Sequence, residues 1–256
     1  VDCLMVEHGM SCLFEMSQSE LFEMPDSFDP ASHYKALKVN LWSSYKARLI
    51  QLYLKYFVYV TRHGVYLDAF AGPQNPSLED SWSARCVIEN EPPLIRRIHL
   101  FEKDKRKFEL IERMINSTPG KFYQEAKREI TRHLGDSNQL VPEFLANRPI
   151  KDSQATFCLL DQHTAECDWS LVKFLSEHKG AGNKIELFYF FPEGWIDRAI
   201  SGFKDPDVEM RRWWGREDWR CLQRTKKMDR VKLLVDRFST ELGYKHSCSY
   251  PIFNSK

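Results

Sequence analysis

The sequence predicts an α/β fold, a doubly wound and mostly parallel sheet with helices on both faces. Between residues 65 and 191, five short apolar runs typical of strands alternate with segments typical of helices. The first four runs each end in a polar residue, and the carboxyl ends of parallel strands share one edge of a sheet. The fifth run, Lys184 to Phe191, is almost continuously apolar, which is typical of a strand buried on both faces.

Composition limits the partners that the whole surface can attract. Of the 256 residues, 37 are Lys or Arg and 36 are Asp or Glu, which gives a net charge of +1. No global field therefore recruits nucleic acid or acidic membranes, and any such partner must be held by a local patch. The hydrophobic share of 43% is enough for a sizeable core.

The cysteines and the apolar runs indicate a compartment. Seven scattered cysteines, without a pair at two-residue spacing, argue against a zinc knuckle or a redox dithiol and favour a reduced cytosol. The longest apolar runs are far shorter than the ~18 residues needed to span a bilayer. Glu7 and His8 interrupt the region where a secretory signal would be apolar. We therefore expect a cytoplasmic protein.

The first 60 residues are expected to form an N-terminal arm and an amphipathic helix, followed by one α/β domain over 61–256. Residues 1–30 read as an irregular arm. From Ala31 to about Tyr59, large apolar residues recur at spacings of three and four, which predicts a helix. Lys46 lies off this stripe. The stripe suits a core face or a ligand-contacting face. Its members are Tyr34, Leu37, Leu41, Tyr45, Leu49, Tyr53 and Phe57.

The stretch Val65 to Gln74 organises the domain. A short apolar strand ends in Asp68 and is followed by a turn of small residues, among them Ala71 and Gly72. In doubly wound sheets, ligands bind beyond the carboxyl ends of the strands, and small residues let a ligand approach the backbone. Asp68 would point into that crevice. The alternative is a buried strand that ends in an Asx-type turn.

The second strand, Ile95 to Phe101, ends in Glu102, and Asp104 is placed to cap a helix from Lys105 to Asn116. A carboxylate at this strand end, 34 residues after Asp68, is placed to accept hydrogen bonds from ribose hydroxyls. Taken alone, such a Glu is more often a solvated surface charge.

The third and fourth strands end in polar groups too. The third, about Glu129 to Leu134, runs into Asp136 and Ser137. Asp136 can either cap the helix that follows or accept a hydrogen bond from an exocyclic amine. The fourth strand, Ala155 to Leu160, is followed by Asp161 and His163.

The C-terminal third begins with an insertion over about 194–224 that is rich in Trp and Arg. Its Arg211, Arg212, Trp213, Trp214 and Arg216 suit a surface that stacks bases or binds a partner. The alternative is that the indoles fill a junction with the sheet while the arginines are solvated.

After the insertion we expect a helix from Thr225 to Leu242 and a last strand from Tyr244 to Phe253. Because the chain stops soon after that strand, a final strand of the fold is expected to be missing.

These motifs, in this order, resemble class I Rossmann-like methyltransferases that use S-adenosylmethionine and, more closely, the three-Cys-motif partner proteins of bacteria. The resemblance runs from about residue 31 to the end. It rests on five segments: Tyr66 to Pro73, Phe101 to Asp104, Gly135 to Asn138, Leu159 to Asp161, and Tyr250 to Phe253.

The resemblance implies roles for individual residues. The first turn, with Asp68, Phe70, Ala71 and Gly72, would lie under the methionine moiety of S-adenosylmethionine. Glu102, with Lys103 beside it, would hold the ribose, and Asp136, with Ser137, the adenine amine. Asp161 would occupy the catalytic position, where His163 would accept a proton, although a loop His is most often a surface residue. No metal is implied. The partner would be a protein carrying a three-Cys motif.

The sequence departs from that pattern at two places. Gln74 stands where a second Gly is usual, which narrows the room for the methionine carboxylate. Asp161 is followed by Gln162, His163 and Thr164, without the Pro-Pro-aromatic run that holds a base amine, so methylation of base amines is not predicted.

Three functions follow from these observations. The first is a methyltransferase with an unknown acceptor, nucleic acid or a partner protein, in a bacterial multi-component system such as a defence system. The second is a scaffold or partner protein that keeps the fold without catalysis. The third, a nicotinamide-dependent dehydrogenase, is weaker, because Gly-x-Gly-x-x-Gly is absent after the first strand.

Overall fold

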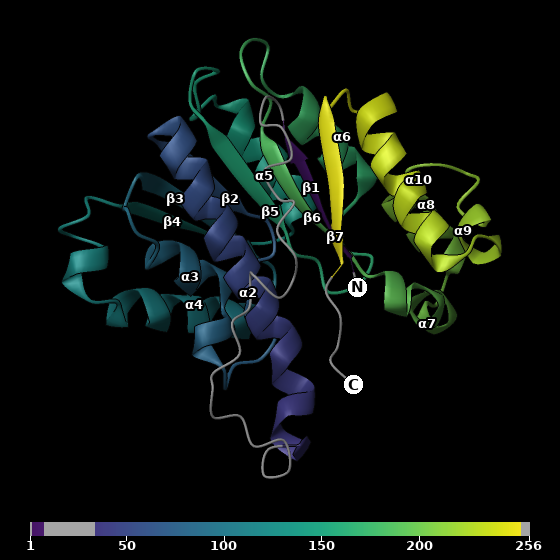
Figure 1. Cartoon of the computed structure of the whole chain (residues 1–256), viewed down its shortest axis with the longest axis horizontal. Coiled ribbons are helices and arrows are strands. Elements are labelled where there is room, and N and C mark those ends of the chain that lie inside the picture. Colours follow the sequence, from purple (N-terminus) through teal and green to yellow (C-terminus); the bar gives the residue numbers. More distant parts are fainter. Residues whose placement is uncertain (1, 8–33, 252–256) are drawn as a thin grey trace.

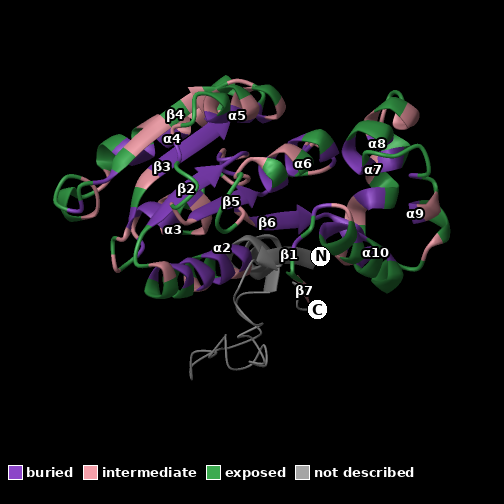
Figure 2. Ribbon diagram, turned by 90° about the horizontal axis from the view of Figure 1, so that it is seen from above, coloured by how far each residue is buried: buried purple, intermediate pink, exposed green. Residues whose placement is uncertain are grey.

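A computed structural model describes residues 2–7 and 34–251 of the chain (Figure 1). It is a three-layer α/β arrangement around one seven-stranded sheet, with strand order β4-β3-β2-β5-β6-β1-β7 (Figure 2). Five neighbouring strands are parallel, and the fold class predicted from the sequence is confirmed at this level. They are β2 (Gly64–Asp68), β3 (Ile95–Glu102), β4 (Glu129–Leu134), β5 (Thr156–Leu160) and β6 (Glu186–Phe191).

The other two strands complete the sheet beyond β6. β1 (Asp2–Glu7) pairs antiparallel with β6 and, on its other side, antiparallel with β7 (His246–Pro251). The described part of the N-terminal arm is therefore a strand, which corrects the expectation of an irregular segment there. Residues 8–33 lie outside the described residues.

Side chains alternate across the sheet between two apolar layers. On β2, Val65 and Leu67 belong to one core cluster and Tyr66 to the other. On β6, Leu187, Tyr189 and Phe191 face the first cluster while Phe188 and Phe190 face the second. Both faces of the central strands are thus covered, as is typical of parallel sheets.

Helices cover one face of the sheet in the order α2 (Tyr34–Thr61), α3 (Ser83–Ile88) and α4 (Lys105–Ser117). Short 3-10 turns, η1 (Glu79–Ser81) and η2 (Gly120–Phe122), precede α3 and follow α4. Asp104 accepts hydrogen bonds from the Arg106 and Lys107 amides, which confirms its predicted role as the cap of α4.

The opposite face is covered by α5 (Ser137–Ala146), α6 (Trp169–Glu177), α8 (Pro206–Trp214) and α10 (Lys227–Thr240). Asp136 accepts from the Asn138 amide and caps α5. The Trp- and Arg-rich insertion contains η3 (Glu193–Trp195), α7 (Ile196–Gly202), α8 and α9 (Cys221–Arg224). The insertion therefore folds as helices packed on the first core cluster.

Candidate cofactor site

The carboxyl ends of β2, β3, β4 and β5 surround one cavity of about 190 Å³. The turn after β2 forms its floor, and the loops after the other three strands form its walls. Of the residues predicted for the site, Phe70, Gly72, Glu102, Lys103, Asp136, Ser137, Asp161 and His163 line this cavity. Gln74, Asp104, Lys107 and Glu166 line it as well.

Glu102 and Gly72 fit together on one wall. The Glu102 side chain is almost buried, and its Oε1 accepts from the Asp104 amide at 2.7 Å. A Cβ built on Gly72 would lie only 1.9 Å from Glu102 Oε2. The absence of a side chain at position 72 is therefore what lets the carboxylate lie over the turn.

Asp68 lies beneath the cavity and not in its wall. The residue is fully buried, and its carboxylate accepts from the Tyr66 hydroxyl at 3.0 Å and the Phe70 amide at 3.2 Å. Burial, aided by the nearby Asp161 carboxylate, raises the pKa of Asp68 to about 7. The expectation that Asp68 points into the crevice is therefore wrong; the carboxyl group supports the turn from below.

The end of β4 contributes Asp136 and Ser137. Asp136 Oδ1 accepts from the backbone and side-chain amides of Asn138, both at 3.0 Å, and the Asp136 side chain lies at the surface of the cavity. The buried Ser137 hydroxyl donates to the Ala69 carbonyl, so it ties the start of α5 to the turn after β2. Asp136 thus caps α5 and borders the cavity at the same time.

Asp161 is held by a lysine from α2. Lys46 Nζ lies 2.8 Å from Oδ1 and 2.7 Å from Oδ2 of Asp161, and both side chains are almost fully buried. The Lys46 ammonium also lies 5.1 Å from the centre of the Phe190 ring. The predicted catalytic carboxylate is therefore one half of a buried ion pair.

The loop after β5 is organised around Glu166. Its carboxylate accepts from the His163 amide at 3.1 Å and from Lys103 Nζ at 3.0 Å. These contacts keep the pKa of Glu166 below its usual range, although burial acts in the opposite direction. The His163 ring is exposed at the cavity mouth and meets the Trp195 ring edge-on at 5.9 Å.

A recess of about 20 Å³ adjoins the main cavity on the α2 side. The two spaces share Gly72, Gln74 and Asp161, and the recess adds Lys46 and Trp82. The Gln74 amide nitrogen is buried and has no hydrogen-bond partner among the described residues. Because a buried donor without an acceptor is costly, this nitrogen is suited to an acceptor oxygen of a bound molecule.

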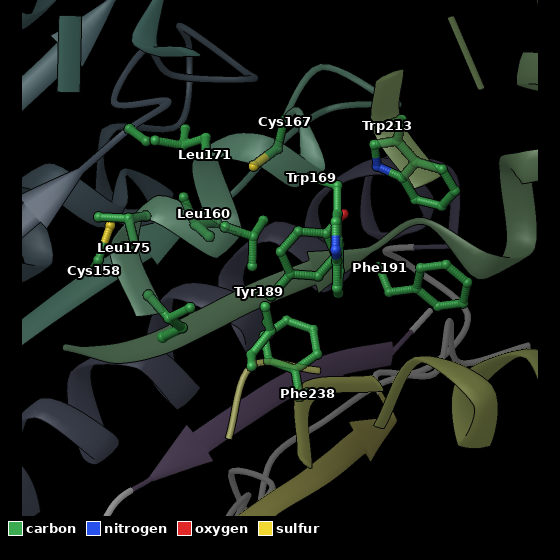
Figure 3. Packing of buried hydrophobic residues seen from close by; sticks show 14 of the residues in the cluster. Cys158, Leu160, Cys167, Trp169, Leu171, Leu175, Tyr189, Phe191, Trp213 and Phe238 are labelled. Atoms are coloured by element: carbon green, nitrogen blue, oxygen red, sulfur yellow. The ribbon is translucent and has the colours of Figure 1, made fainter. Parts of the chain in front are cut away.

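The insertion contributes core and not a stacking surface. Trp213 and Trp214 are buried. The Trp213 ring stacks on Phe191 with centroids 5.8 Å apart (Figure 3). Its Nε1 donates to Gln162 Oε1. Their placement corrects the expectation that these indoles lie on a surface and agrees with the alternative. Arg211, Arg212 and Arg216 are exposed and ion-paired with Glu217, Asp168 and Glu241.

Sequence reasoning missed three residues that shape the site: Lys46, Gln162 and Glu166. For Lys46 a signal was present, since Leu49, Ile50 and Tyr53 follow at helical spacings and share its side of α2. The other two become recognisable only when their partners are placed. Gln162 accepts from the Cys167 amide and donates to the Phe190 carbonyl.

Comparison of the chain with protein-family models, with curated proteins and with solved structures gives no match. Among the described residues, no group of three or more His, Cys, Asp or Glu side chains is arranged to hold a metal ion. No described helix is both long and apolar enough to cross a membrane.

Proposed function

We propose that the chain binds S-adenosylmethionine in the cavity at the carboxyl edge and acts as a methyltransferase whose acceptor is nucleic acid or a partner protein. One observation carries this proposal. The polar groups that follow β3, β4 and β5 converge with the small-residue turn after β2 around a single cavity, where doubly wound sheets bind nucleosides.

In this proposal, residues that line the cavity supply a donor or an acceptor for each part of the cofactor. Glu102 would accept from the ribose hydroxyls, and Asp136 would accept from the adenine amine. Gly72 leaves the turn open to close approach, and the partnerless amide nitrogen of Gln74 would donate to the methionine carboxylate. Gln74 would thereby supply a donor in place of the backbone amide that a second Gly would expose.

When bound, S-adenosylmethionine supplies a methyl group on a positively charged sulfur. The residues of the chain would then orient the acceptor. Asp161 borders both the main cavity and the recess, so its carboxylate is placed to accept a hydrogen bond from an acceptor N–H or O–H. Lys46 fixes the direction of that carboxylate. His163, at the open mouth, would pass a proton to solvent.

A second candidate function is a scaffold that retains the fold without catalysis. The observation in its favour is the ion pair, because both oxygens of the Asp161 carboxylate are already in contact with the Lys46 ammonium and are less available to a methyl acceptor. One variant, Asp161→Ala, distinguishes the two functions. If it loses the methyl transfer of the wild type but still binds the cofactor, the scaffold function is excluded.

Titration calorimetry with S-adenosylmethionine and its demethylated product tests the proposal. The variants are Glu102→Gln, which keeps the acceptor for the Asp104 amide but removes the charge, and Glu109→Gln on the exposed side of α4 as a matched control. We expect the wild type and the control to bind equally and Glu102→Gln to bind at least about tenfold more weakly. Absence of binding by the folded wild type would exclude the proposal.

A further inference from the structure

A second cavity, of about 310 Å³, lies at the opposite, amino edge of the sheet. It opens between the end of α2, the starts of β2 and β3, and the segment before β5. Three of its lining residues are arginines, Arg62, Arg96 and Arg97, and among the described residues no carboxylate lines it. The cavity is therefore positively charged, although the chain as a whole is nearly neutral.

The polar groups of this cavity divide into fixed and available ones. Arg97 is fixed, since its guanidinium donates to the Pro149 carbonyl at 2.7 Å and to Gln154 Oε1 at 2.6 Å. Arg62 and Arg96 are exposed, and neither takes part in an ion pair within the described residues. Two guanidinium groups beside one cavity thus have no anionic partner in the described part of the fold.

His63 also lines the cavity, and its ring is held through both nitrogens. Its Nδ1 lies 2.7 Å from the Thr61 carbonyl, and its Nε2 accepts from the Ala155 amide at 3.1 Å. The ring therefore carries its proton on Nδ1, and it ties the end of α2 to the start of β5. The imidazole holds the rim together and leaves the recognition of a ligand to the guanidinium groups.

Arg62 owes its position at the rim of the cavity to the end of α2. Only three non-glycine residues of the described chain have positive φ angles: Arg62 at 60°, Lys127 at 52° and Arg148 at 49°. All three are basic and exposed. Arg62 and Lys127 immediately precede the segments that enter β2 and β4, and Arg148 precedes the Pro149 carbonyl that holds Arg97. Of the three, Arg62 is the one that lines the cavity, and its amide donates to the Val58 carbonyl, so its left-handed backbone is the cap that ends α2.

We propose that the amino-edge cavity binds a phosphate group, with Arg62 and Arg96 as the recognition residues. The planar guanidinium fork can donate to two phosphate oxygens at once. Phosphate and carboxylate are the two anions whose geometry it matches. The volume lies at the lower end of the range for small-molecule sites, about 300–1,000 Å³. In this proposal the ligand is a phosphate ester or pyrophosphate. Its source is either a free small molecule or a nucleic-acid backbone that reaches this edge.

The test is calorimetry with inorganic pyrophosphate on the full chain, at low and at raised salt. The variant is Arg62→Asn with Arg96→Gln, because Asn tolerates the left-handed backbone at position 62. A matched double variant, Arg198→Gln with Arg224→Gln, removes the same charge from two exposed helical positions of the insertion. We expect binding by the wild type and the control, weakened by salt, and a loss of at least about tenfold in the first variant.

Equal affinities in the two double variants, or no binding by the folded wild type, would overturn the proposal. Arg96→Gln alone provides a second measurement if the double variant does not fold, and it too must weaken binding. A short single-stranded oligonucleotide then separates the sources. Tighter binding than pyrophosphate, lost in the same variant, identifies a nucleic-acid backbone, and comparable affinity identifies a small phosphate. Glu102→Gln must leave pyrophosphate binding unchanged, so this result is independent of the cofactor proposal.

Discussion

Lys46 and Asp161 form a buried ion pair, with Lys46 Nζ 2.8 Å from one carboxylate oxygen and 2.7 Å from the other. The contact joins α2 to the loop after β5, across 115 residues of chain. It also borders the main cavity and the recess beside it. The N-terminal helix is therefore part of the candidate site and not only a cover for the core.

Breaking this pair is expected to destabilise the fold strongly. Lys46→Met leaves the Asp161 charge buried without compensation, which costs about 3–5 kcal/mol. In the double variant Lys46→Met with Asp161→Leu, both charges are replaced by apolar groups, and we expect most of that loss to be recovered. Urea denaturation of the wild type, the two single variants Lys46→Met and Asp161→Leu, and the double variant measures the effect. A double variant as unstable as the sum of its two single variants would show that the pair is not coupled.

Gly72→Ala is expected to disturb the cavity wall. Its Cβ would lie 1.9 Å from Glu102 Oε2 and 2.7 Å from Lys107 Cδ, so both side chains must move. We expect a loss of about 1–3 kcal/mol in the free energy of unfolding, typical of overpacking. The control is Gly202→Ala, since a Cβ at position 202 meets nothing within 4 Å. Equal stabilities for the two variants would contradict the close fit of Gly72 and Glu102.

Asp68 is expected to give stability a pH dependence. Its pKa is about 7 in the folded protein, against 3.8 as the ordinary value. Between these pH values the folded state binds the proton and the unfolded state does not, so this group stabilises the fold at low pH and loses its contribution as pH rises to 7. Asp68→Asn keeps the shape without the titration.

The stability difference between the wild type and Asp68→Asn, followed by denaturation from pH 4 to 8, isolates this contribution. We expect the free energy of unfolding of the wild type to fall relative to that of Asp68→Asn as pH rises. His99 titrates in the opposite sense, because burial lowers its pKa to about 4 and favours its neutral form. Taking the difference removes that contribution. A difference that does not vary with pH would refute the assignment.

Arg237 is expected to be a structural residue of the first core cluster. Its guanidinium lies 3.9 Å from the Trp169 ring centre and 4.2 Å from that of Trp214, and it donates to the Trp214 carbonyl at 2.7 Å. Arg237→Met should cost about 2–4 kcal/mol, because it removes stacking and leaves a buried carbonyl without a donor. Arg216→Met, which removes an exposed ion pair with Glu241, should cost less than about 1 kcal/mol. Thermal denaturation measures the loss of stability in both variants. Similar losses would refute the structural role of Arg237.

The sequence was sufficient to predict the parallel part of the fold. Apolar runs and Asp caps are determined by residues close together in the chain, so they can be recognised in the sequence. The predicted strand over 129–134 coincides with β4, and Asp104 is the predicted cap of α4. β1 was missed because residues 2–7 show no clear alternation of apolar and polar residues. In the sheet it lies between β6 and β7.

The candidate site was predictable only where strand order determines it. Glu102 and Asp136 follow strand ends, so parallel topology alone places them at one edge. The directions of side chains depend on packing, which the sequence does not reveal. Asp68 is turned beneath the cavity by Tyr66, and the indoles of Trp213 and Trp214 are buried because β6 offers Phe191 to pack against.

A crystal structure of the chain with the demethylated product of S-adenosylmethionine tests the central claim most directly. We predict that the ligand lies in the cavity at the carboxyl edge of the sheet, with ribose hydroxyls on the Glu102 carboxylate and the amino-acid end over Gly72 beside Gln74. A ligand bound elsewhere, or a cavity that stays empty at saturating concentrations, would contradict the account.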